Sequence, residues 1–183
     1  FGGLLDHTMS HNEAWNFARL GHLLERSDKT SRILDIKYYI LLPQLEDVGT
    51  PFDTIQWAAL LKSADALEMY RKRSRRITSG RVVQFLLLER DFPRSVHFCT
   101  GSALEALHRI SGTPLNTYAN PAERELGRLC SDLVYANIED VMRGGLHEYL
   151  DSVQRRLNTI DGHVYRQFFA LAPGNGGTIT ARQ

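Results

Sequence analysis

The chain has 183 residues, which suits one domain of ordinary size with a substantial buried core. Apolar residues make up 43% and charged residues 23%, values near the average for globular proteins, so the composition excludes a disordered or fibrous protein. The 22 Lys and Arg against 21 Asp and Glu leave a net charge of +1, so overall charge favours no particular partner.

The N-terminal stretch "FGGLLDH" is typical of neither a signal peptide nor a transit peptide, and we expect the sequence to be part of a longer chain. No apolar run approaches the roughly 18 residues that a membrane span needs. The two cysteines, Cys99 and Cys130, form no C-x-x-C pair and no Cys/His cluster. We therefore expect buried structural thiols, a reduced cytoplasmic location and no membrane segment.

The first predicted helix is long. Ser10-His11-Asn12-Glu13 matches a capping box, and apolar or small residues then recur every three or four positions up to Pro43. A helix of about thirty residues would span roughly 45 Å, the full height of a bundle.

Five further helices are expected in chain order. The second begins at Thr50-Pro51 and frays after the basic run 71–76, and the third covers "VVQFLLL", for which a strand is conceivable but a helix is favoured. The fourth follows Asp91-Phe92-Pro93 and ends at Ser111-Gly112, the fifth begins at Asn120-Pro121 and ends before Gly144-Gly145, and the sixth covers about 146–171. The sequence thus predicts an all-α bundle of about six helices over residues 1–172, with a flexible tail at 173–183.

Three segments carry a resemblance to a known family: "WNFARLGHLLERSDKTSRILD" at 15–35, "FLLLERDFPRSVHFC" at 85–99 and "ALEALHRISGT" at 103–113. They resemble the alpha-E family, an all-helical domain named for a Glu-Arg motif, here Glu25-Arg26. Members are usually longer and carry a related Glu-Arg helix near their start, so the resemblance implies the C-terminal portion of such a protein. It also implies a bacterial partner of ATP-grasp ligases and transglutaminase-like peptidases.

The middle of the long helix carries an unusual amount of charge. Glu25, Asp28, Arg32 and Asp35 lie three or four positions apart and form one stripe, which on an arbitrary helix would be a solvated face with local ion pairs. The resemblance implies a second Glu-Arg helix that would face this one. We therefore hypothesise a polar layer between two helices, in which Arg26 and Arg32 bridge the acidic residues and small Ser27 and Ser31 allow close approach.

Other candidate sites are weaker. The segment "LERDFPRSV" places Arg90, Asp91 and Arg94 around a helix break. The free backbone amides there either bind an anion or a partner protein, or are capped by the chain itself. Glu105 and His108 have Glu-x-x-His spacing only once, so neither a metal nor another cofactor is expected. The basic run 70–76 is interpreted as cations at a helix C-terminus, which makes nucleic acid an unlikely partner.

The sequence therefore favours a non-catalytic helical partner or scaffold for an ATP-grasp ligase or transglutaminase-like peptidase system in peptide or amide-bond metabolism. The alternative is an enzyme of that pathway with a charged site around Glu25, Asp28, Arg32 and Arg94. An interaction protein should expose a large apolar face, whereas an enzyme should have convergent charges in a pocket.

Overall fold

The computed structural model describes residues 2–40 and 50–170. Over these residues the secondary structure is entirely helical, which confirms the predicted all-α class. The described helices are α1 (Gly2–Thr8), α2 (Glu13–Ile40), α3 (Pro51–Ser63), α4 (Leu67–Arg73), α5 (Ser79–Leu88), α6 (Val96–Ser111), α7 (Pro121–Tyr135), α8 (Ile138–Gly144) and α9 (Leu146–Phe168).

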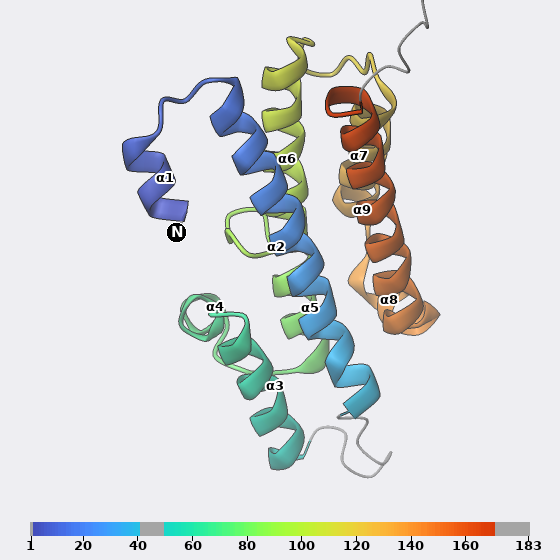
Figure 1. Cartoon of the computed structure of the whole chain (residues 1–183). Helices are drawn as coiled ribbons and strands as arrows, with labels where there is room; N and C mark the ends of the chain where they lie inside the picture. Colours follow the sequence, from blue (N-terminus) through green and yellow to red (C-terminus); the bar gives the residue numbers. More distant parts are fainter. Residues whose placement is uncertain (1, 41–49, 171–183) are drawn as a thin grey trace, which may run out of the picture.

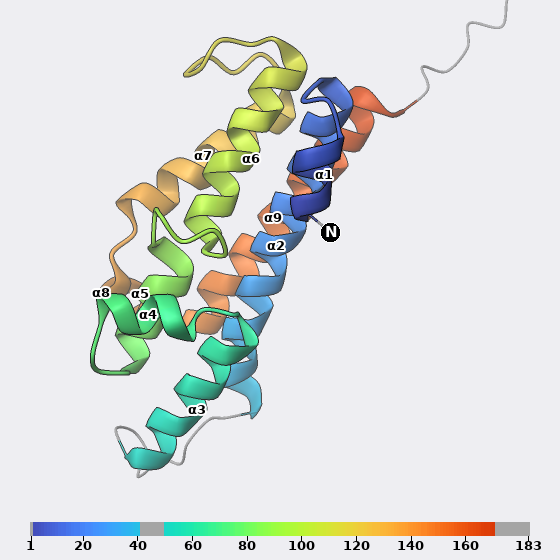
Figure 2. The same ribbon diagram turned by 90° about the vertical axis from the view of Figure 1, so that its left-hand side faces the viewer.

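Four long helices form the body of the molecule. Helix α2 packs against α6 and α9, and α7 packs against the same two helices, so the four close a ring around one core. Helix α5 lies below α6, with α3 and α4 beside it at the end of the bundle, while α1 stands off from α2 near the opposite end (Figures 1 and 2). This arrangement follows helix-bundle packing, in which each helix buries one apolar stripe.

The structure has more helices than the six expected. Helix α1 was not predicted at all, because seven residues of "GGLLDHT" give too short a pattern to read. The expected second helix breaks into α3 and α4 at Asp65, whose φ of 51° is left-handed. The expected fifth helix breaks into α7 and α8, because the Asn137 side chain accepts a hydrogen bond from the Glu139 amide and so starts a new helix.

Helix α2 confirms the prediction of one long helix, although its start differs. The Asn12 side chain, rather than Ser10, accepts a hydrogen bond from a backbone amide, that of Trp15, at 3.2 Å. Ser27 and Ser31 are fully buried in the middle of α2, so the two small side chains do lie on a face covered by other helices. Pro43, the expected helix end, and the expected tail 173–183 fall outside the described residues.

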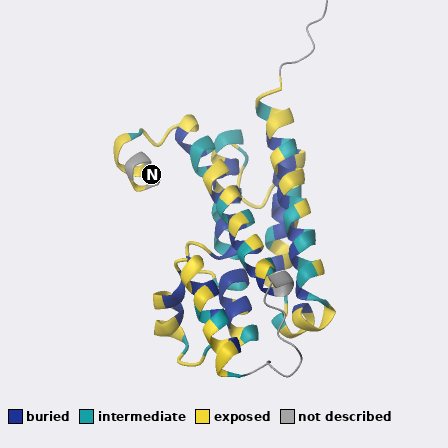
Figure 3. Ribbon diagram, turned by 60° about the horizontal axis from the view of Figure 1, so that its bottom comes forward, coloured by how far each residue is buried: buried dark blue, intermediate teal, exposed yellow. Residues whose placement is uncertain are grey.

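Leucine dominates the core. Each of the four long helices contributes fully buried leucines, among them Leu20 and Leu34 of α2, Leu107 of α6, Leu126 of α7 and Leu150 of α9. Exposed residues cover the outer faces of the helices and most of the described part of α1 (Figure 3). None of the described helices is long and apolar enough to cross a membrane.

Candidate functional site

The charged stripe of α2 lies at the surface. Glu25 pairs with Lys29 at 2.6 Å, and Asp28 pairs with Arg32 at 2.7 Å, in both cases one helical turn apart. The side chain of Glu25 is 57% exposed and that of Arg32 is 56% exposed, so neither forms a buried layer with the helices around α2. The part of the hypothesis that requires a second Glu-Arg helix stays a prediction.

Asp35, at the lower end of the stripe, joins α2 to α9. Its carboxylate oxygen lies 2.8 Å from Nδ1 of His147, the second residue of α9. The hydrogen bond with Asp35 raises the pKa of the His147 imidazole above its ordinary value, although partial burial opposes the shift. This contact ties the ends of two long helices together.

Arg26 is directed away from the acidic residues that we expected it to bridge. Its Nη1 donates to the backbone oxygen of Pro93 at 3.2 Å, and one turn later the Thr30 hydroxyl donates to the backbone oxygen of Arg94 at 2.8 Å. No ion pair joins Arg26 to Glu25 or Asp28 among the described residues, and the expected bridge to a second Glu-Arg helix stays a prediction. Instead, the middle of α2 holds the turn between α5 and α6.

That turn is the second stretch singled out from the sequence, and the chain satisfies much of it internally. Ser95 accepts a hydrogen bond from the Phe98 amide and so caps α6, while the Glu89 carboxylate accepts the amides of Arg90 and Asp91. A cap rather than an anion site therefore accounts for these amides. Arg90 and Asp91 are exposed.

The remaining candidate in the turn, Arg94, pairs with Asp65 of the α3–α4 connection at 2.8 Å. No ion pair among the described residues joins Arg94 to Glu25 or Asp28. A single site formed by all four residues of the enzyme alternative stays a prediction.

Cys99 lies against the same turn, and its environment is that of an inert thiol. Burial raises the pKa of Cys99 to about 11, even though the charges of Arg26 and Arg94 lower it. Burial likewise raises the pKa of Cys130 to about 11. Thiols with such pKa values carry little thiolate at neutral pH, which agrees with the structural role expected of both.

A cleft of about 560 Å³ lies between α1, the first half of α2 and the α5–α6 turn. Trp15, Arg19, His22 and Arg26 of α2 line it, at spacings of four, three and four residues that place them on one helix face. The Arg19 guanidinium lies over the Trp15 ring at 5.2 Å, and the His11 ring stacks on the same indole at 4.1 Å. The cleft therefore combines aromatic surface with guanidinium and imidazole groups.

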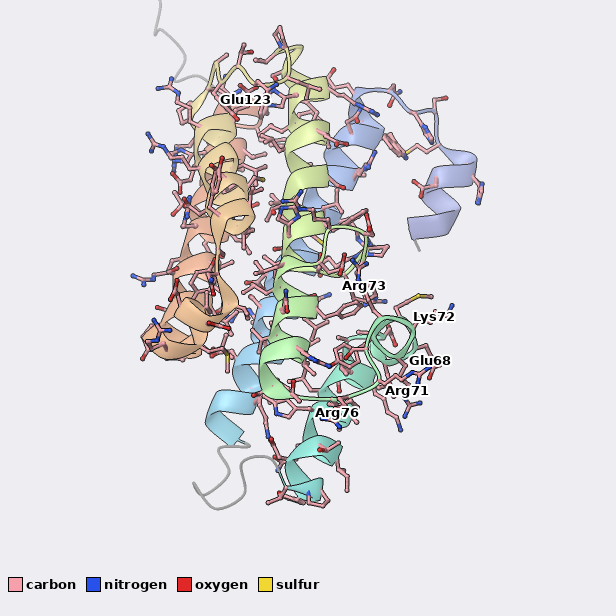
Figure 4. All side chains as sticks on the ribbon, turned by 180° about the vertical axis from the view of Figure 1, so that it is seen from behind. Glu68, Arg71, Lys72, Arg73, Arg76 and Glu123 are labelled. Carbon is pink, nitrogen blue, oxygen red and sulfur yellow. The ribbon has the colours of Figure 1, made fainter. Side chains whose placement is uncertain are left out.

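The position of the basic run 70–76 confirms the prediction that its cations lie at the end of a helix. Arg71, Lys72 and Arg73 form the last turn of α4, where cations complement the helix dipole. Arg71 pairs with Glu68, while Arg73 pairs with Glu89 at 3.1 Å. Figure 4 shows Arg71 and Lys72 on the outer side of α4.

The single Glu-x-x-His pattern does not form a metal site. Glu105 is exposed, whereas His108 is buried and lies close enough to Glu123 to affect its carboxylate. Over residues 2–40 and 50–170, no group of three or more His, Cys, Asp or Glu side chains is arranged to hold a metal ion.

Sequence reasoning missed Trp15, Arg19 and His22 as candidate residues. The signal was present, since they share a helix face with Arg26, but an aromatic and basic helix face reads equally well as ordinary surface. Only the position of the α5–α6 turn, more than sixty residues away in the chain, shows that this face lines a cleft.

Comparison with known proteins identifies one family. The profile of the family named Alpha-E, described as a predicted alpha-helical domain with a conserved ER motif, matches residues 1–169. No curated protein and no solved structure matches the chain. Since the match covers almost the whole sequence, the chain belongs to the Alpha-E family.

Proposed function

We propose that this Alpha-E domain is a non-catalytic helical partner of an ATP-grasp-type ligase or transglutaminase-like peptidase in bacterial amide-bond metabolism. The choice of enzyme classes follows from the family resemblance. The choice of a binding role rests on one observation, the apolar outer face of α3.

Helix α3 is apolar on both sides. Its inner face buries Trp57, Leu60 and Leu61 in the bundle, while Phe52 and Ile55 on its outer face are 56% and 64% exposed. Ala59, one turn further, continues the outer stripe. Large apolar side chains that are this exposed and lie next to each other on one helix face are suited to contact with another protein.

The enzyme alternative has weaker support. Its charged side chains on α2 form pairs with their own helix neighbours, and two of them, Glu25 and Arg32, are more than half exposed. Catalytic carboxylates need a pocket that removes them from water, whereas the Glu25 carboxylate of this stripe is 57% exposed.

The test measures binding of a purified ATP-grasp-type ligase and of a purified transglutaminase-like peptidase, each by biolayer interferometry. The variant Phe52→Ser/Ile55→Ser removes apolar surface that is already exposed, so its melting temperature should stay close to that of the wild type. Tyr165→Ser, on the exposed face of α9 at the other end of the bundle, is the matched control.

We expect one of the two enzymes to bind the wild type and Tyr165→Ser alike, and to bind the α3 variant at least tenfold more weakly. Binding that is unchanged by the α3 variant would reject α3 as the contact surface. Failure of both enzymes to bind the wild-type protein would reject the partner role itself.

A further inference from the structure

The cleft beside α1 concentrates positive charge that the chain does not neutralise. Neither Arg19 nor Arg26 has an ion pair among the described residues: Arg19 lies over Trp15, and Arg26 donates to the Pro93 carbonyl. That bond uses one of the five N–H donors of the Arg26 guanidinium. Asp6 of α1 is the acidic residue in the wall of the cleft, so the two arginines leave it net positive.

The distance between the two arginines limits the ligand. They are seven residues apart on one face of α2, which corresponds to about 10.5 Å along the helix axis. Arg19 lies over Trp15 and Arg26 is held at the Pro93 carbonyl, so the two guanidinium groups are anchored at separate points of the cleft. A ligand that uses both needs two anionic groups with a spacer between them.

The wall of the cleft around the two arginines is mainly apolar, with the imidazole of His22 between them on the same face of α2. Leu23 of α2 and Phe98 at the start of α6 line this part of the cleft, with Pro93 beside them. The volume, about 560 Å³, lies in the range of ordinary ligand sites, and a mainly apolar wall with a few fixed polar groups is typical of them. The spacer of the ligand is therefore expected to be apolar.

We propose that this cleft binds a short acidic segment of a polypeptide, with two carboxylates three residues apart and an apolar side chain between them. In a polyproline II segment, side chains three positions apart point to the same side about 9 Å apart, close to the separation of the arginines. Each guanidinium then meets a carboxylate, for which its planar donor geometry is well suited. The inference goes beyond the proposed enzyme partner, since it depends on the cleft and not on α3.

The probe is the peptide acetyl-Glu-Pro-Leu-Glu-amide, and its control is the uncharged acetyl-Gln-Pro-Leu-Gln-amide. Binding to the full chain is measured by isothermal titration calorimetry in buffers of low and high salt. We expect the acidic peptide to bind at least tenfold more tightly than the control, and to bind more weakly at high salt because both carboxylates are screened. Equal binding of the two peptides would overturn the proposal.

Arg19→Gln tests the site without touching the Arg26–Pro93 contact, and Arg109→Gln is the matched control, since it removes the same charge from an exposed position on α6. We expect Arg19→Gln to lower the affinity for the acidic peptide about tenfold or more, and Arg109→Gln to change that affinity by less than about twofold. Equal affinities for the two variants would overturn the assignment to this cleft. Displacement of the peptide by inorganic phosphate at equal concentration would also overturn it, in favour of a phosphate site.

Discussion

The ion pair between Lys37 and Asp53 allows the sharpest test of what holds this fold together. Their side chains are only 6% and 10% exposed, and Nζ lies 3.0 Å from Oδ1. The Lys37 ammonium also donates to the Gln56 amide oxygen and lies 5.1 Å from the Trp57 ring. The pair therefore joins the C-terminal part of α2 to α3 in a place where water cannot replace either partner.

Changing Asp53 to Ala removes this carboxylate from beside a buried ammonium group, which keeps its hydrogen bond to Gln56. Breaking a buried pair in this way costs about 3–5 kcal/mol. For a domain of this size, each kcal/mol lowers the melting temperature by about 2–4 °C, so we expect a decrease of roughly 6–20 °C. Urea denaturation followed by circular dichroism measures the free energy of unfolding directly.

The matched control is Asp140→Ala, which breaks an exposed pair with Arg143 at 3.1 Å and should cost less than about 1 kcal/mol. The double variant Lys37→Met/Asp53→Leu removes both charges and should recover most of the loss, because an apolar pair of similar volume replaces a buried ion pair at little cost. A loss for Asp53→Ala no larger than that for Asp140→Ala would refute the burial argument. If the double variant does not recover the free energy of unfolding, the argument that the unpaired buried charge causes the loss is refuted.

Four further predictions follow from single contacts. Glu123→Gln should cost about 1–3 kcal/mol at neutral pH, since this buried carboxylate accepts hydrogen bonds from a hydroxyl and a backbone amide. Burial raises the pKa of Glu123, but those hydrogen bonds outweigh it and lower the pKa overall. The stabilisation by Glu123 is therefore complete above the ordinary pKa of a glutamate and should be lost as the pH falls through the lowered pKa of the folded state, which urea titrations at several pH values measure. The pKa of His147 is raised, so the stabilisation by His147 is complete below about pH 6.5 and is lost as the pH rises through the pKa of the folded state. The variant His147→Gln should flatten the dependence of the free energy of unfolding on pH in that range. Arg32→Ala should cost less than about 1 kcal/mol, similar to Lys62→Ala, because its pair is exposed; a loss several times larger would restore the buried layer expected from the sequence. Finally, iodoacetamide at pH 8 should modify Cys99 at least about a hundredfold more slowly in the folded protein than in urea, as mass spectrometry would show.

The all-helical class was predictable because apolar periodicity and helix starts are local signals. Thr50-Pro51 and Asn120-Pro121 each begin a helix as expected, and in both cases the residue before the proline accepts an amide hydrogen bond. The breaks at Asp65 and Asn137 were missed, since one left-handed residue or one side-chain cap interrupts an apolar pattern without changing its period.

The contacts between distant segments were not predictable. Lys37 and Asp53 each read as ordinary surface charges on separate helices, and no local pattern shows that they meet. The same holds for Asp35 and His147, which are 112 positions apart. Such pairs depend on how the helices pack, and a single sequence does not carry that information in its periodicity.

The charge in the middle of α2 has two different explanations, divided by helix face. On the outer face, Glu25, Asp28 and Arg32 make local pairs that contribute little to stability. On the adjacent face, Arg26 contacts the α5–α6 turn and lines the cleft at the same time. Arg26→Lys separates these two roles: a lysine can still donate one hydrogen bond to the Pro93 carbonyl, but it lacks the planar fork that contacts a carboxylate bidentately. Near-normal stability with weakened binding of the acidic peptide would therefore show that Arg26 acts in ligand binding, whereas a loss of stability with unchanged binding would assign it to the fold alone.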